Sequence, residues 1–332
     1  MALLSAMYPT LMDVTTALDP NGSVATVAEI LNQTNEMLDD MVFLEGNLPT
    51  GHKSTVRTGI PAPTFRQLYG FVQPTKSSRA QITDSCGMME AYAEVDKAAA
   101  DLNGNTNEFR LSEDRAFIEG MSQEAAASMF QANEAVNPEK YTGLNARFNS
   151  LAAGNADNII DALGTGGDNA SLWLIGWGPN TIHGIYPKGS KAGLQVTDKG
   201  QVTIQEPGGT GLMEGYRTHY RWDLGLTVRD WRYVVRIANI DRSDLSPDAS
   251  TGANLPQLMF EAEQRVPNLA SAKFAWYGDR SVMTKIMQQY SAGTKSSTLG
   301  WQDVGGKKTL VNGTGIPMRR VDALAVDEAR VV

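Results

Sequence analysis

The residue types that most often carry catalysis are sparse in this sequence. It has three histidines, His52, His183 and His219, and one cysteine, Cys86. A metal site needs several clustered ligands, and no two of these histidines have the spacing that brings side chains together on one helix or strand. We expect His219 to be solvated or hydrogen-bonded. Cys86 has no obvious activating base nearby and is expected to be a small, buried side chain.

Motifs that bind phosphates or activate a nucleophile are also missing. The glycine-rich stretches at 164–167 and 208–211 are not followed by the Lys-Ser/Thr pair of a phosphate loop, and a closing glycine is absent after Gly211. No Gly-x-Ser-x-Gly elbow occurs. The carboxylate pairs Asp39-Asp40 and Glu113-Asp114 fit a charged helix face and a helix start. We therefore predict no catalytic, cofactor-binding or metal-ligating residue, and no enzyme.

Composition places the chain among ordinary folded proteins. Its 332 residues are 42% hydrophobic and 20% charged, with a formal net charge of −8, which argues against a dedicated nucleic-acid condenser. A single cysteine excludes an intrachain disulfide and favours a reducing compartment. We see no signal peptide and no apolar run near the ~20 residues of a membrane helix. The expectation is a soluble protein made inside the cell, without a membrane partner.

One stretch predicts an unusually long β-strand. From Tyr216 to Val228 every even position is apolar, aromatic or threonine, and the odd positions are mostly polar. This period of two marks a strand with one buried face. The apolar phase reverses after Arg229-Asp230, so a bulge or tight turn is expected there. At about 3.3 Å per residue such a strand spans roughly 43 Å, which suits an elongated molecule.

The sign of the charge reverses sharply near the N-terminus. Residues 1–52 contain seven carboxylates and no lysine or arginine, and the spacing of apolar residues predicts an amphipathic helix over about 24–43. Residues 53–82 contain five cations and no carboxylate. Prolines and aromatic residues in this second segment predict two extended arms of a projecting hairpin, because a loop of thirty residues is unusual inside a compact domain.

Other elements are read from capping and periodicity. Residues 86–102 fit either a helix or a strand followed by a helix. Ser112 is the predicted N-cap of a helix that reaches about Ala132. Further expected elements are a strand at 171–175, a hairpin with strands at 193–197 and 201–205, a helix at 255–265, a strand at 272–277, a helix at 281–290, and strands within 304–325.

Four stretches, taken in this order, resemble the major capsid proteins of tailed bacteriophages with the Hong Kong 97-type fold. They are Glu94–Lys97, Phe109–Asp114, Asn137–Leu144 and Gly315–Leu324. Their order and spacing along the chain carry the resemblance more than any one of them. The branch we expect is that of short-tailed phages such as the Bordetella phage type.

The resemblance implies an α+β Hong Kong 97-type capsid fold with four parts. These are an N-terminal arm at 1–47, an extended β-hairpin loop at 48–84, a peripheral domain with a spine helix and long strands at 85–150 with 216–240 and 304–332, and an axial domain at 151–215 with 241–303. The implied function is self-assembly into pentamers and hexamers of an icosahedral shell around double-stranded DNA. Such a shell would be a virion component assembled in the host bacterial cytoplasm, with no cofactor and no sequence-specific DNA binding.

The resemblance also implies partners. A portal is expected. A separate scaffolding protein is expected as well, since the arm begins at once without a fused scaffolding segment. A decoration or cement protein is a further possible partner, because some shells add one. A different virion protein, such as a tail-tube or portal subunit, and an enzyme with an unrecognised site are the alternatives. From the charge reversal we predict an inter-subunit contact between cations of the loop and carboxylates of the arm. Its residues are Arg57, Arg66, Lys76 and Arg79 on one copy and Glu29, Glu36, Asp39 and Asp40 on another.

Overall fold

The computed structural model describes residues 35–101, 106–205, 209, 211–293, 300–304, 307–311 and 315–332. These residues divide into two compact units. The smaller unit contains residues 88–125 and 193–222, apart from the gaps just given, and the larger unit contains 35–87, 126–192 and 223–332. The strands β3 (Ser78–Asp96) and β8 (Leu212–Val228) and the helix α4 (Thr106–Gln131) contribute residues to both units.

The larger unit is built on a mixed sheet. Strand β5 (Asn169–Trp177) lies between antiparallel β9 (Val234–Asp241) and antiparallel β10 (Lys273–Gly278). The main path of the sheet has the order β13-β10-β5-β6-β8-β3-β2. The remaining strands of this unit are β1 (Phe43–Glu45), β2 (Gly51–Gly59), β4 (Ile159–Asp161), β6 (Ile182–Tyr186) and β13 (Met318–Arg320), with β11 (Gly300–Val304) and β12 (Lys307–Val311) forming a separate two-stranded sheet.

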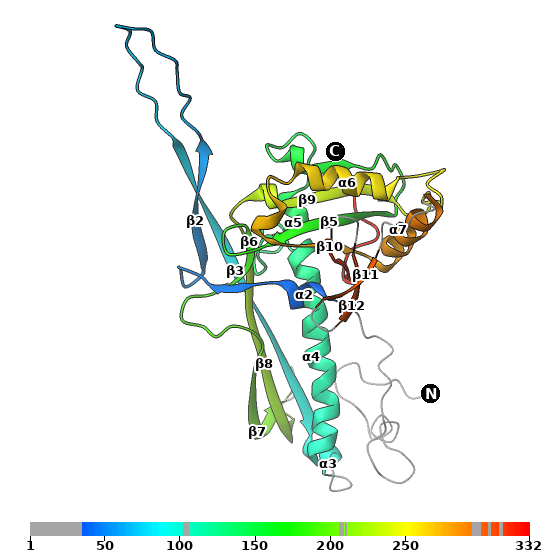
Figure 1. Ribbon diagram of the computed structural model, residues 1–332. Coiled ribbons are helices and arrows are strands. Elements are labelled where there is room, and N and C mark those ends of the chain that lie inside the picture. The colour runs from blue at the N-terminus through cyan, green and yellow to red at the C-terminus, as the bar shows by residue number, and fades with distance from the viewer. Residues whose placement is uncertain are drawn as a thin grey trace. The chain divides into compact units, whose positions relative to one another are not determined.

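Both faces of β5 are buried, which explains why its sequence is continuously apolar from Leu172 to Trp177 rather than alternating. Leu172 and Leu174 belong to a cluster with residues of α6 (Leu255–Arg265), at the top of Figure 1, and α7 (Arg280–Gly293), on its right. On the opposite face Trp173 packs against Phe130 and Phe148, with ring centroids 5.9 and 6.0 Å apart. The core of the larger unit therefore lies on both sides of β5.

The smaller unit packs one helix on a ribbon of long strands. Strand β7 (Gln195–Gln205) pairs antiparallel with β8, and a buried cluster joins Met121 of α4 to Ala93 of β3 and Tyr220 of β8. The rings of Phe117 and Tyr220 are parallel, 6.2 Å apart. Odd-numbered β8 residues point to the other face, where Arg217 pairs with Glu94 at 2.6 Å. In this part of β8 the alternation thus gives an apolar face under α4 and an ion-paired face opposite, whereas both faces are buried from Asp223 to Val228.

The remaining helices are short. They are α2 (Met37–Asp40), α3 (Lys97–Ala100), α5 (Leu144–Arg147) and the 3-10 turns η1 (Ala156–Asn158), η2 (Trp231–Tyr233) and η3 (Leu269–Ser271). Among the described helices, none combines the length and hydropathy that a membrane span requires.

Most predicted elements are confirmed. The long strand exists as β8, which has 17 residues, and the phase reversal at Arg229-Asp230 coincides with η2 between β8 and β9. The two arms of the hairpin are β2 and the first half of β3, paired antiparallel (Figure 1). At 86–102 the second alternative holds, since β3 continues to Asp96 and α3 follows.

Three predictions of local structure are wrong. The helix α2 ends at Asp40, so no helix reaches 43; the rest of the predicted 24–43 helix lies largely outside the described residues. Ser112 lies inside α4, which begins at Thr106, because tertiary packing of Phe109 extends the helix beyond the local capping signal. Residues 193–205 form no hairpin: β7 is one strand, and its register with β8 shifts between Asp198 and Gln201, where Gly200 has a φ of 68°.

Candidate assembly surfaces

The tip of the extended loop exposes large apolar side chains. Between β2 and β3, five of them are 86–109% exposed: Ile60, Phe65, Leu68, Tyr69 and Phe71. Single exposed apolar residues are ordinary, but a group of this size on one projecting segment is typical of a surface that binds another protein. The tip is therefore the first candidate surface.

The cations of the loop lie both on its strands and beyond them: Arg57 is on β2, Arg79 is on β3, and Arg66 and Lys76 lie in the segment between these strands. Arg57, Arg66, Lys76 and Arg79 are all exposed, and Arg57 lies directly opposite Arg79 in the β2–β3 register. Two like charges facing each other across a strand pair repel and destabilise the hairpin. An anionic surface placed against this pair would relieve the repulsion, so the loop is better suited to a complex than to isolation.

The predicted acidic partners fall into three different settings. Glu29 lies outside the described residues. Asp39 is exposed, and Glu36 is partly exposed with its carboxylate 4.0 Å from the Arg319 guanidinium. Asp40 is buried: it accepts hydrogen bonds from Lys273 at 2.8 Å, Tyr277 at 3.0 Å and Arg319 Nε at 3.0 Å. Asp40 therefore anchors α2 to β10 and β13 within one subunit, and we leave it out of the inter-subunit contact.

The root of the loop is fastened to the sheet by close backbone packing and a buried ion pair. A Cβ on Gly51 would lie 2.0 Å from the carbonyl oxygen of Asp84, so only glycine fits there. The buried Asp84 carboxylate accepts a hydrogen bond from Thr227 and pairs with Arg147 of α5 at 2.8 Å. The base of the hairpin is thus held by α5 and by the end of β8.

Two histidines meet at the same root. The rings of His52 on β2 and His183 on β6 lie edge to face with centroids 5.9 Å apart. Burial, the neighbouring His52 and Arg229 lower the pKa of His183 to about 4, against the opposing influence of Gly178 and Asp84. Burial and Arg229 also lower the pKa of His52. His219 lies apart from them, 3.3 Å from Glu90 and stacked on Tyr92, as its place on the polar face predicts.

Cys86 is partly exposed, so the prediction of a buried side chain is wrong, but its surroundings do not activate the thiol. Burial and the carboxylates of Asp223 and Asp84 raise the pKa of Cys86 to about 12, which disfavours the nucleophilic thiolate. Within the described ranges, no group of three or more His, Cys, Asp or Glu side chains has the geometry of a metal site.

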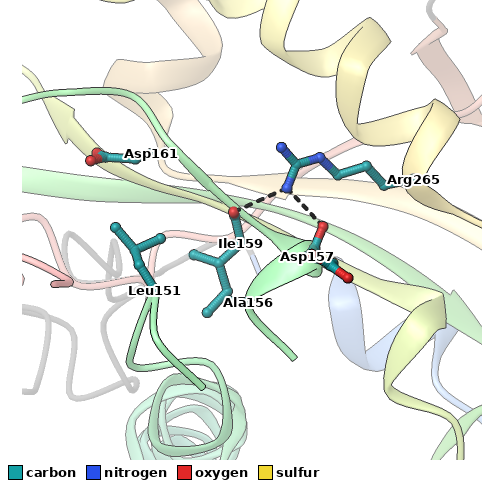
Figure 2. Close-up of a pocket in the computed structure, with 6 residues that line it drawn as sticks. All are labelled: Leu151, Ala156, Asp157, Ile159, Asp161 and Arg265. Atoms are coloured by element: carbon teal, nitrogen blue, oxygen red, sulfur yellow. Dashed lines mark hydrogen bonds between the residues drawn. The ribbon is translucent and has the colours of Figure 1, made fainter. Parts of the chain in front are cut away.

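One cavity, of about 560 Å³, opens beside η1 and β4 (Figure 2). It is lined by Leu151, Ala156, Asp157, Ile159, Asp161 and Arg265. Arg265 Nη1 donates to the carbonyl oxygens of Asp157 at 2.7 Å and Ile159 at 3.1 Å, and its Nη2 donates to Glu261 at 2.6 Å. The guanidinium therefore ties α6 to η1 and β4.

The family model for the major capsid protein GP7 matches residues 19–332. The chain belongs to this family. It is a major capsid protein, a structural component of a bacteriophage virion, and the expected Hong Kong 97-type fold is confirmed. No curated protein sequence matches the chain significantly. The relation to the Bordetella phage branch stays a prediction.

The likeness to one solved capsid structure supports the same assignment. The chain is 31% identical to the capsid chain of bacteriophage Epsilon15, with a TM-score of 0.79, covering 100% of this chain and 99% of that one. It also matches the capsid of bacteriophage JBD30 at 10% identity and a TM-score of 0.46, covering 89% and 93% of the two chains. The capsid of an empty GTA particle gives 12% identity and a TM-score of 0.45 over 71% and 99%.

Sequence reasoning missed two features of these surfaces. It treated the histidines as isolated, because His52 and His183 are distant in the chain. The sheet order β6-β8-β3-β2 brings the two residues together. It also placed Asp40 on an outer charged face. The only signal against that was the paired Arg319-Arg320, which supplies the buried cation.

Proposed function

We propose that this capsid protein assembles into pentamers and hexamers of an icosahedral shell around double-stranded DNA, with the extended loop lying against a neighbouring copy. The exposed apolar tip carries the proposal, because Phe65, Tyr69 and Phe71 would be covered only in a complex. A portal, a separate scaffolding protein and a decoration or cement protein are the further partners we infer. Assembly would take place in the host bacterial cytoplasm, without enzymatic activity and without sequence-specific DNA contacts.

The tip can be tested without disturbing the subunit. We expect the combined change Phe65→Ser, Tyr69→Ser and Phe71→Ser to abolish shells, since three apolar anchors would be lost, while the melting temperature of the subunit changes by less than about 2 °C. Each of these side chains is at least 98% exposed, and exposed positions contribute little to folding. Negative-stain microscopy and sedimentation would measure assembly.

Val136→Ser, which removes an exposed apolar residue elsewhere, is the matched control. Normal shells from the triple variant would refute the role of the tip, and tubes from the wild type would refute the shell.

The predicted charge contact is retained in a narrower form. We propose that Arg57, Arg66, Lys76 or Arg79 of one copy meets Asp39, with Glu36 nearby, on another copy; Glu29 remains a further candidate. The repelling pair Arg57–Arg79 supports this contact. Exposed ion pairs contribute only about 0–1 kcal/mol each, but a shell repeats the contact at every seam, and complementary charge mainly selects the partner and the register.

A charge swap tests this contact. Arg66→Glu with Arg79→Glu is expected to raise the critical concentration for assembly several-fold at low salt while the subunit stays folded, and Asp39→Lys should partly restore it. Glu36→Lys is avoided in the rescue, since it would place a second cation near Arg319. Light scattering across a salt series gives the readout, because added salt should shrink the difference between variants. Assembly of the arginine variant that equals wild type at every salt concentration would contradict the contact.

A further inference from the structure

The root of the extended loop holds a contact between the buried His183 and the partly buried His52 that the shell-forming role does not explain. His183 is 1% exposed, and the Nδ1 atoms of both His183 and His52 are buried without a hydrogen-bond partner within the described residues. Burial disfavours a proton most strongly on His183, because the charge would lie in the protein interior with only the Gly178 backbone and Asp84 to favour it. The partly exposed His52 is affected in the same direction.

The charged groups around the pair reinforce this. Arg229, at the end of β8, disfavours a proton on both rings, and each ring disfavours a proton on the other. Among the described residues, Asp84 on β3 is the carboxylate that favours a proton on the pair, and its own charge is already engaged by Arg147 and Thr227. A second positive charge at the root would therefore face more repulsion than attraction.

The pair also lies where it can control the loop. His52 is the second residue of β2 and lies opposite Asp84 of β3 in the strand register. His183 is on β6 and lies opposite Thr227 of the neighbouring strand β8. One ring thus belongs to the projecting hairpin and the other to the sheet that carries it. We propose that the His52–His183 contact is an acid-sensitive clasp, which fastens the root of the loop at neutral pH and releases it when the imidazoles are protonated.

The direction of the effect follows from linkage. In an opened root the histidines regain their ordinary pKa of 6.5, whereas in the closed root the pKa of His183 is about 4. The open form then binds more protons, so acid favours opening as the pH falls from about 6.5 toward 4. Since each pKa unit corresponds to a factor of ten, the opening equilibrium should rise on the order of 10²-fold by pH 4, with His52 adding in the same direction.

Hydrogen exchange on the full-length, unassembled subunit tests the clasp. Amide exchange is followed by mass spectrometry from pH 7 to pH 4.5 and corrected for the intrinsic chemical rate. Peptides from β2 and the first half of β3 should lose at least tenfold in protection on acidification, whereas peptides from β5 and β10 should not. His183→Gln and His52→Asn should each flatten this response. His219→Asn, which changes the third histidine outside the root, should leave it intact.

Two outcomes would overturn the clasp. One is a wild-type acid response that persists in both root variants, as expected if Asp84 alone governed the root. The other is loss of protection spread uniformly over the larger unit. If His183→Gln fails to fold, the proposal can be tested on the wild-type protein. The pH dependence of hydrogen exchange at the imidazole carbon of His183 then gives the titration midpoint of this residue. A titration midpoint of His183 near its ordinary value, rather than well below it, would refute the clasp.

Discussion

Replacing Asp40 by alanine is expected to lower the free energy of unfolding of the subunit by about 3–5 kcal/mol. The Asp40 carboxylate is almost completely buried and pairs with Arg319, whose side chain is only 8% exposed. Removing Asp40 takes the hydrogen-bonded counter-ion from the buried Arg319 and leaves Glu36 at 4.0 Å. Loss of one partner from a buried ion pair costs more than the intact pair contributes. Tyr277 loses its acceptor as well, and burial, followed by the charge of Asp40, raises the pKa of Tyr277 well above its usual value, so it acts as a neutral donor.

Two neighbouring changes sharpen this experiment. Asp40→Asn keeps one acceptor oxygen and removes only the charge, so a smaller loss is expected. Asp39→Ala is the matched control, because Asp39 is exposed on the same short helix and exposed substitutions usually change stability by less than about 0.5 kcal/mol. Urea denaturation followed by tryptophan fluorescence gives the free energies. An Asp40→Ala loss below about 1 kcal/mol would show that the anchor of α2 is not important for the subunit.

Met121→Asp is expected to prevent soluble folding. Met121 is 5% exposed and packs with Ala93 and Tyr220 under α4. An aspartate there buries a carboxyl group with no cation in the apolar cluster, and it also loses the packing of the methionine side chain; together these effects exceed several kcal/mol, which is comparable with the whole stability of a domain. Soluble yield, circular dichroism and melting temperature would record the effect.

The adjacent residue provides a matched control for that change. A Cβ built on Gly120 has no atom within 4 Å among the atoms that surround it, and the residue is exposed on the same helix. Gly120→Asp should therefore fold, and it should gain slightly from the better helix propensity of aspartate. Met121→Leu, which conserves volume, should cost less than about 1.5 kcal/mol. A soluble, assembly-competent Met121→Asp protein would mean that the buried face of α4 is assigned incorrectly.

The amino-acid sequence alone determined the features that depend on local pattern. The alternation at 216–228 identified β8, because period two reflects one buried face and needs no knowledge of the partner strand. The periodicity of 255–265 gave α6 with its bounds, and the charge reversal at residue 53 marked the start of the extended loop near β2. The order of four short motifs indicated the capsid family, which the family model and the Epsilon15 likeness confirm.

Only the tertiary structure decided which distant side chains share a site. Helix α4 starts before its predicted cap because Phe109 is buried against Val95 and Ala100, a contact that no local signal encodes. Asp40 looked like a solvated helix charge until Arg319, Lys273 and Tyr277 closed around it. His52 and His183 became a pair only through the strand order of the sheet. In each case the deciding energy comes from burial and charge pairing between residues far apart in the chain, and a single sequence records neither.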